Sequence, residues 1–172
     1  MTRYRSRAER LAEEALSKTE QAVPVDITKV AEHYGLLIRE QELEDAVSGM
    51  LLVRNKRAVI GVNRNHHLNR QRFTVAHEIG HYLMHTDQSQ IFIENLSLYR
   101  NQLSESGTNV REIEANAFAA ELLMPTKVLK KVVGGRLIDA FYDEPIIRHL
   151  ASEFGVSTQA MTVRLSKLNL IN

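Results

Sequence analysis

The sequence predicts an α+β protein in which a small antiparallel sheet packs on a helical core. Two observations favour this class. Apolar residues follow helical patterns over residues 6–20, 73–85, 110–125 and 145–168. Between the first two of these segments lie three runs with strand composition: Leu36–Glu40, Val47–Arg54 and Ala58–Asn63. The length of 172 residues fits one domain, or one domain with a small appendage.

The N-terminal helix is predicted over residues 6–20 because Ser6 and Glu9 form a capping-box pattern. Its apolar stripe consists of Ala8, Leu11, Ala12, Ala15 and Leu16. A short second helix is expected to begin after Asp26 as N-cap and to end at Gly35.

The strand runs follow this second helix. Asn55–Arg57 has the length of a hairpin loop between the second and third runs. Gly49, inside the second run, indicates either a β-bulge or the close approach of another backbone. Ile91–Ile93 is a candidate for a further short strand. We expect these strands to form the small sheet.

The central helical stretch, Phe73–His85, contains the motif His77-Glu78-x-x-His81. Residues four apart on a helix lie on the same face, so both imidazoles can point at one ion. Zn²⁺ binds neutral imidazole nitrogens in a tetrahedral shell, and Glu78 is placed to deprotonate a water molecule that the ion activates. The alternative is a buried helix that happens to carry two histidines. The stretch is apolar almost all round, and buried polar groups need partners, so we favour the metal site.

A catalytic zinc needs a third protein ligand. His85 follows His77 by eight residues, which is about 12 Å along a helix, so one ion cannot be shared by both. In the helical stretch Val110–Pro125, the apolar arc is formed by Ala115, Ala119, Leu122 and Leu123.

Glu112 and Asn116 fall in the middle of this arc, whereas Glu114 and Glu121 fall on the opposite side. We therefore expect Glu112 to be the third ligand, with Asn116 orienting a metal-bound imidazole. Two alternatives stay open. Glu114 is the ligand, or Glu112 only begins the helix in a capping box with Asn109.

Gly80 gives a structural reason for the site to assemble. A glycine inside a helix costs roughly 1 kcal/mol relative to alanine. Gly80 shares its face with His77, and the small residues Ala115, Ala119 and Ala120 can pack closely against it. This packing would bring Glu112 within reach of the two histidines.

At these residues the chain resembles the ImmA/IrrE family of metallo-endopeptidases. The resemblance rests on Phe73-Thr-Val-Ala-His-Glu-Ile-Gly-His-Tyr-Leu-Met-His85 and on Glu112-x-Glu-Ala-Asn-x-Phe-Ala-Ala-Glu-Leu-Leu-Met-Pro125. It extends upstream to Pro24-Val-Asp-Ile and Val47-Ser-Gly-Met. It implies a zincin-like core and a gluzincin-like zinc site, with His77, His81 and a helix-borne glutamate as ligands and Glu78 as base. It also implies intracellular cleavage of a helix-turn-helix repressor, in mobile elements or stress responses.

The sequence also offers candidates for the oxyanion donor and for the substrate-binding sheet edge of such a peptidase. The oxyanion of the tetrahedral intermediate needs a hydrogen-bond donor, for which His66, His67, Tyr99 and Tyr142 are alternatives that the sequence does not separate. Zinc endopeptidases commonly hold the substrate as an added strand, and we expect Val47–Val53 to provide that sheet edge. The alternative is a meander that only covers the helices.

The C-terminal segment has the layout of a helix-turn-helix. One helix is expected from Pro145 to Phe154, and a second is expected after Ser157. We divide the chain into a metallopeptidase domain, 1–135, and a C-terminal helical segment, 136–172. If this motif binds DNA, the second helix would read the bases through Gln159, Thr162, Arg164 and Lys167. The segment is only weakly basic, so we favour a hairpin that packs on the domain or docks the substrate protein.

Composition limits the partners. The 22 basic and 21 acidic residues give a net charge of +1, with no general attraction to nucleic acid or anionic membranes. The absence of cysteine excludes disulfides and thiolate ligands. The first ten residues are too charged for a signal peptide, and no run is long enough to span a membrane. We therefore expect a cytoplasmic protein.

The sequence favours a zinc-dependent endopeptidase that uses His77, His81, Glu112 and Glu78 on a protein substrate. Two other classes stay open. One is a regulatory module that controls a transcription factor by contact without cleavage. The other is a DNA-binding regulator that uses the C-terminal hairpin.

Overall fold

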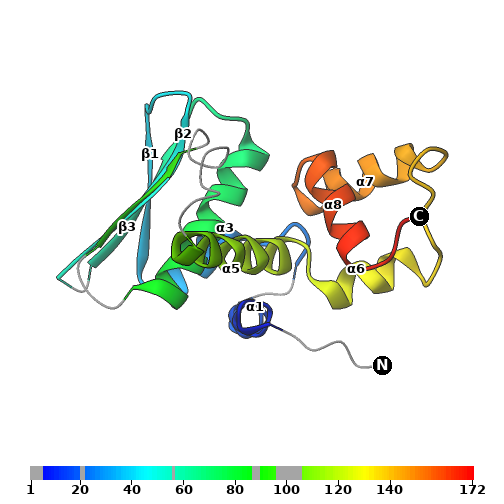
Figure 1. Ribbon diagram of the computed structural model, residues 1–172, viewed down its shortest axis with the longest axis horizontal. Helices are drawn as coiled ribbons and strands as arrows, with labels where there is room; N and C mark the ends of the chain where they lie inside the picture. Colours follow the sequence, from blue (N-terminus) through cyan, green and yellow to red (C-terminus); the bar gives the residue numbers. More distant parts are fainter. Residues whose placement is uncertain (1–5, 20–21, 56, 87–89, 96–105) are drawn as a thin grey trace.

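The computed structural model describes residues 6–19, 22–55, 57–86, 90–95 and 106–172. Within these ranges the chain forms a four-stranded sheet and seven helices (Figure 1). The strands are β1 (Leu36–Gln41), β2 (Val47–Arg54), β3 (Arg57–Asn63) and β4 (Gln90–Asn95). The helices are α1 (Arg7–Ser17), α2 (Ile27–His33), α3 (Leu68–His85), α5 (Ser106–Leu123), α6 (Thr126–Val133), α7 (Glu144–Phe154) and α8 (Thr158–Lys167).

The α+β class is confirmed, and the N-terminal helices begin as the sequence predicts. The Ser6 hydroxyl accepts from the Glu9 backbone amide, and the Glu9 carboxylate accepts from the Ser6 amide, which completes the capping box. The Asp26 carboxylate accepts from the amides of Thr28 and Lys29. Gly35 has a φ of +70°, a conformation that ends α2 and that glycine adopts without strain.

The sheet is mixed, which corrects the expectation of an antiparallel one. Its strand order is β1-β3-β2-β4, with β1 parallel to β3 and β2 antiparallel to both of its neighbours. The connection after β1 is held at the end of β3 by Asn63. Its Nδ2 atom lies 3.2, 3.2 and 2.9 Å from the carbonyl oxygens of Leu43, Glu44 and Val47. The chain therefore crosses the end of β3 before it enters β2, and β3 returns beside β1 in the same direction.

The expectation that Val47–Val53 forms a sheet edge is wrong. This segment belongs to β2, which pairs with β3 on one side and β4 on the other. Both alternatives for Gly49 are confirmed. The register with β4 shifts between Val47 and Gly49, and a Cβ atom at Gly49 would lie 2.7 Å from the carbonyl oxygen of Gly61. The same Cβ would collide with the side chain of Thr74, so the missing side chain lets the sheet approach α3.

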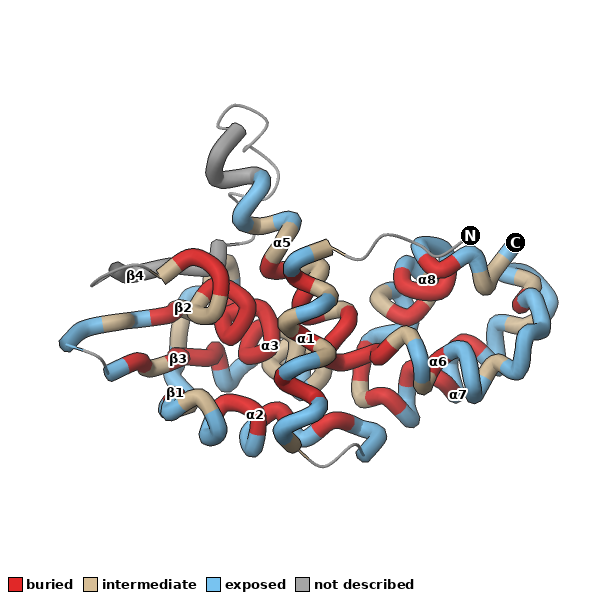
Figure 2. Tube along the Cα trace, turned by 90° about the horizontal axis from the view of Figure 1, so that it is seen from below, coloured by how far each residue is buried: buried red, intermediate tan, exposed pale blue. Residues whose placement is uncertain are grey.

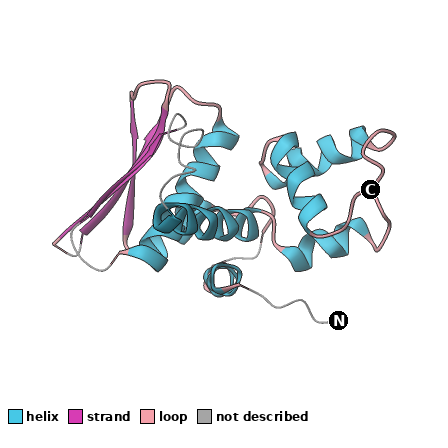
Figure 3. Ribbon diagram, in the orientation of Figure 1, coloured by secondary structure: helices cyan, strands magenta, loops and turns pink. Residues whose placement is uncertain are grey.

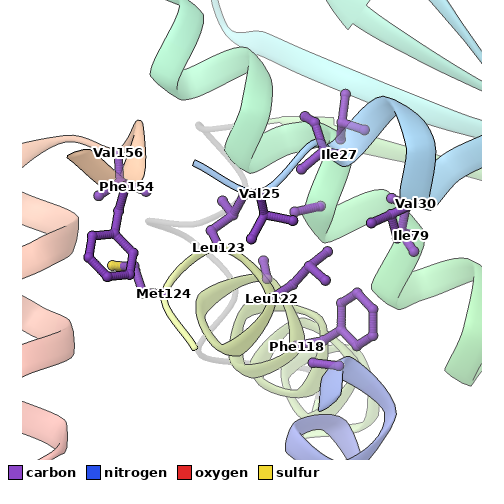
Figure 4. Packing of buried hydrophobic residues seen from close by; sticks show 14 of the residues in the cluster. Val25, Ile27, Val30, Ile79, Phe118, Leu122, Leu123, Met124, Phe154 and Val156 are labelled. Atoms are coloured by element: carbon purple, nitrogen blue, oxygen red, sulfur yellow. The ribbon is translucent and has the colours of Figure 1, made fainter. Parts of the chain in front are cut away.

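Helix α3 lies between the sheet and the C-terminal helices (Figures 1 and 3). Figure 2 shows it buried along its middle, where every residue from Thr74 to His81 is buried, as its apolar composition predicts. Apolar side chains of α2, α3 and α5 form the centre of the core, which continues through Met124 to Phe154 and Val156 of the C-terminal segment (Figure 4).

The C-terminal helices are fixed to the rest of the molecule by polar contacts as well. Arg164 of α8 is 4% exposed and pairs with Glu121 of α5, which is 2% exposed. The Arg164 Nε atom also donates to the Met124 carbonyl at 3.1 Å. The expectation that Glu121 faces away from the core is therefore wrong, because α8 covers that side of α5.

The division of the chain into two parts at residue 135 stays a prediction. No helix in the described part of the chain combines the length and apolar character needed to cross a membrane.

Candidate metal centre

Helix α3 places His77 and His81 one above the other, as the spacing predicts. Their ring centroids are 4.6 Å apart, and the two Nε2 atoms lie 2.9 Å from each other. Both side chains are almost fully buried, at 1% and 2% exposure. Glu78 is 1% exposed and follows His77 directly, so its carboxylate belongs to the same buried region.

Helix α5 brings Glu112 to the two histidines. A Cβ atom at Gly80 would lie 3.2 Å from the Cα atom of Ala115, so the absence of a side chain at Gly80 allows the two helices to approach closely. The carboxylate of Glu112 then bridges both rings. Its Oε2 atom lies 3.1 Å from Nε2 of His77, and its Oε1 atom lies 3.1 Å from Nε2 of His81. One possible ligand atom from each of these three residues falls within 4.8 Å of the others.

The structure separates Glu112 from its alternatives. Helix α5 begins at Ser106, so Asn109 and Glu112 lie inside the helix and the proposed capping box is wrong. Glu114 is directed instead to His85, with 3.6 Å between its Oε2 atom and the His85 Nε2 atom. Burial and the neighbouring His81 lower the pKa of His85, while Glu114 acts in the opposite direction. Neither Glu114 nor His85 belongs to the converging group.

The charges at the centre favour an ionised carboxylate. Burial by itself raises the pKa of Glu112. The hydrogen bonds from His77 and His81, and the positive charge of these rings when they are protonated, outweigh this effect and hold the pKa well below its usual range. Glu112 is therefore negatively charged at neutral pH, in the form that binds cations.

Asn116 orients the first histidine. Its Oδ1 atom lies 3.0 Å from Nδ1 of His77, and an amide oxygen accepts a hydrogen bond, so Nδ1 carries the proton. In the neutral ring the Nε2 atom then has a lone pair that faces the Glu112 carboxylate at 3.1 Å. Two acceptors at this distance repel each other unless a proton or a metal ion lies between them. The arrangement is the one expected for a cation site with an outer hydrogen-bond partner.

Of the candidates for the oxyanion donor, the three in the described part of the chain do not join this centre. His67 is the N-cap of α3 and precedes His77 by ten residues, which is about 15 Å along the helix. His66 lies further back, with its Nε2 atom 3.1 Å from the Asp45 carbonyl oxygen. Tyr142 is 87% exposed and lies in the loop before α7. Tyr99 lies outside the described residues.

Comparison with known proteins agrees with the geometry. Residues 31–166 match the model of the IrrE N-terminal-like domain of the M78 peptidases. The chain belongs to this IrrE-like family. Metallopeptidase ImmA of Bacillus subtilis (strain 168) is 29% identical over 108 residues, which cover 62% of this chain and 56% of that protein.

A solved structure also has the fold of this IrrE-like chain. A Mycobacterium tuberculosis transcriptional regulator superposes with a TM-score of 0.64 at 18% identity, covering 95% of this chain and 47% of that one. The chain thus spans about half the length of these two relatives. The family that the motifs resemble is confirmed, and the matched residues include both helices of the centre.

Proposed function

We propose that the protein is a zinc-dependent endopeptidase whose substrate is another protein. The observation that carries this proposal is the convergence of His77, His81 and Glu112, together with the buried Glu78 that follows His77 on the same helix. Family membership and the likeness to a metallopeptidase support the same reaction class.

The residues present fit a zinc ion. Two imidazoles and one carboxylate form a three-ligand set of the kind used by catalytic zinc, which keeps one position open. The hydrogen bond from His77 to Asn116 leaves the Nε2 atom of His77 available as a ligand. When bound, the ion supplies Lewis acidity, which makes water more acidic and a peptide carbonyl more electrophilic.

Glu78 is the general base of the proposed reaction. Its carboxylate takes a proton from the attacking water as the oxygen bonds to the peptide carbonyl carbon. It then gives that proton to the nitrogen of the leaving amine as the carbon–nitrogen bond breaks. Water and peptide are thereby converted into a carboxylic acid and an amine, and Glu78 returns to its initial state.

The substrate we propose is a helix-turn-helix repressor in the cytoplasm. The resemblance to the ImmA/IrrE family suggests this class. The likeness of the fold to a transcriptional regulator is compatible with a role in transcription. A module that controls the same partner by contact alone is the main rival.

The test is cleavage of purified helix-turn-helix repressors by the zinc-supplied protein. We expect wild type and Glu32→Gln, which changes an exposed acid of α2, to cleave at equal rates. We expect Glu78→Gln to bind the same amount of zinc and to cleave about 10²–10⁴-fold more slowly, because it lacks the general base. Equal cleavage by Glu78→Gln would contradict the assignment. A stable complex with no cleavage by wild type would favour the contact-only module.

A further inference from the structure

A cleft of about 760 Å³ separates the C-terminal helix α8 from the two helices of the metal centre. All three helices contribute side chains to its walls. Those that matter here are Arg70 and Phe73 of α3, Ile113 and Asn116 of α5, and Val163 and Lys167 of α8.

The cleft borders the metal centre through side chains that contact His77, and none of the three ligand side chains lines it. Asn116 lines it and also contacts the Nδ1 atom of His77 at 3.0 Å. Phe73 lines it as well, and its ring centroid is 6.3 Å from that of His77. A substrate chain with its scissile bond at the centre would therefore have a nearby residue within reach of the cleft.

The walls of the cleft are partly apolar and exposed. Ile113 is 59% exposed and Val163 is 48% exposed, although they lie on different helices that line the same space. Phe73 and Ala120, both half-buried, add apolar surface. An apolar side chain of a ligand would cover these groups and remove them from water.

The described residues that line the cleft carry positive charge and no negative charge. Its ionisable lining consists of Arg70, Arg164, Lys167 and His67, and no Asp or Glu is among the described residues that line it. Glu121 pairs with Arg164 from outside the cleft. Arg70 donates to the neutral hydroxyl of Ser48 at 2.7 Å, a contact that leaves its charge in place. The rim therefore favours an acidic ligand.

We propose that this cleft is a substrate subsite that binds an apolar side chain with a neighbouring acidic side chain of the cleaved protein. The apolar side chain covers Ile113 and Val163, and the carboxylate lies near Arg70 and Lys167. This inference rests on the proposed peptidase function and specifies the substrate sequence. It also gives α8 a role in substrate docking. Of the four side chains expected to read DNA, Arg164 is buried.

The subsite can be tested by peptide binding without cleavage. Zinc-supplied Glu78→Gln protein is titrated into fluorescent twelve-residue peptides, and anisotropy gives the Kd. One peptide carries a central Leu followed by two Asp residues. Its two partners replace Leu by Ser or both Asp residues by Lys. We expect the Leu-Asp peptide to bind at least about tenfold more tightly than either partner, since it alone satisfies both features.

Variants of the cleft complete the test. Val163→Asp adds a negative charge to the apolar wall, and Lys167→Glu reverses a charge at the rim. Both positions are exposed, and circular dichroism checks the fold. We expect each to weaken binding of the Leu-Asp peptide at least about tenfold, while Lys131→Glu, an equal charge change on an exposed position of α6, leaves the Kd unchanged.

Equal affinity for the three peptides, or unchanged affinity in both cleft variants, would overturn the subsite. So would tighter binding of a DNA duplex that Val163→Asp and Lys167→Glu abolish. The peptide test measures binding without cleavage, so its result does not depend on whether the protein is a peptidase. If wild type cleaves no protein but the peptide pattern holds, the peptidase proposal fails and the cleft stands only as a peptide-binding site. If wild type cleaves but the pattern is absent, the subsite fails.

Discussion

The side-chain oxygen of Asn116 lies 3.0 Å from Nδ1 of His77, and the other nitrogen of that ring faces Glu112. This contact fixes which nitrogen is available to a metal. We predict that Asn116→Ala lowers zinc affinity about 10–100-fold, since loss of an outer hydrogen-bond partner has effects of this size. Asn116→Asp keeps an acceptor and should retain tighter binding. Competition with a chromogenic chelator measures both, and unchanged affinity in Asn116→Ala would show that the contact does not support the site.

Gly80 sets the distance between α3 and α5. We predict that Gly80→Val destabilises the protein by about 1–3 kcal/mol, because its side chain would overlap Ala115 and Phe118 in a packed interface. Zinc affinity should fall as well, since Glu112 moves away from the histidines. Urea unfolding and chelator competition measure the two effects. Glu32→Val, at an exposed position of α2, controls for the helix propensity of valine. Normal zinc affinity in Gly80→Val would contradict the claim that close packing at Gly80 assembles the metal site.

The buried pair of Glu121 and Arg164 joins α5 to α8, whereas Glu144 and Arg148 form an exposed pair along α7. Removal of one member of a buried pair leaves an uncompensated charge, so Arg164→Met should cost about 3–5 kcal/mol of unfolding free energy. Arg148→Met should cost no more than about 1 kcal/mol, because its pair is in solvent. Urea denaturation compares them. Equal losses would mean that the buried pair does not hold α8 in place.

The elements that carry the site could be predicted from the sequence because their signals are local. The spacing of His77 and His81 fixes their common face, and the helical phase of Val110–Pro125 separates Glu112 from Glu114. Gly80 adds a reason for contact between these helices, which the structure confirms.

Other features depend on contacts between distant segments and could not be predicted in the same way. Glu121 falls on the outer face of α5 by periodicity, but Arg164, forty-three residues later, covers it with α8. The strand runs were identified, whereas their order depends on the Asn63 contacts that direct the crossover. The pairing of β4 with β2 likewise places Val47–Val53 inside the sheet. Local pattern indicates which face is apolar, and it does not indicate which segment covers a face.

The most direct test of the account is the zinc content and affinity of wild type, Glu112→Gln and Glu114→Gln, purified together and supplied with zinc. The two substitutions remove the same charge from the same helix. We predict one zinc per chain in wild type and in Glu114→Gln, and loss of tight binding in Glu112→Gln alone, because only Glu112 bridges His77 and His81. Loss in Glu114→Gln with retention in Glu112→Gln would contradict the site. Absence of zinc from wild type would contradict the metal-dependent function.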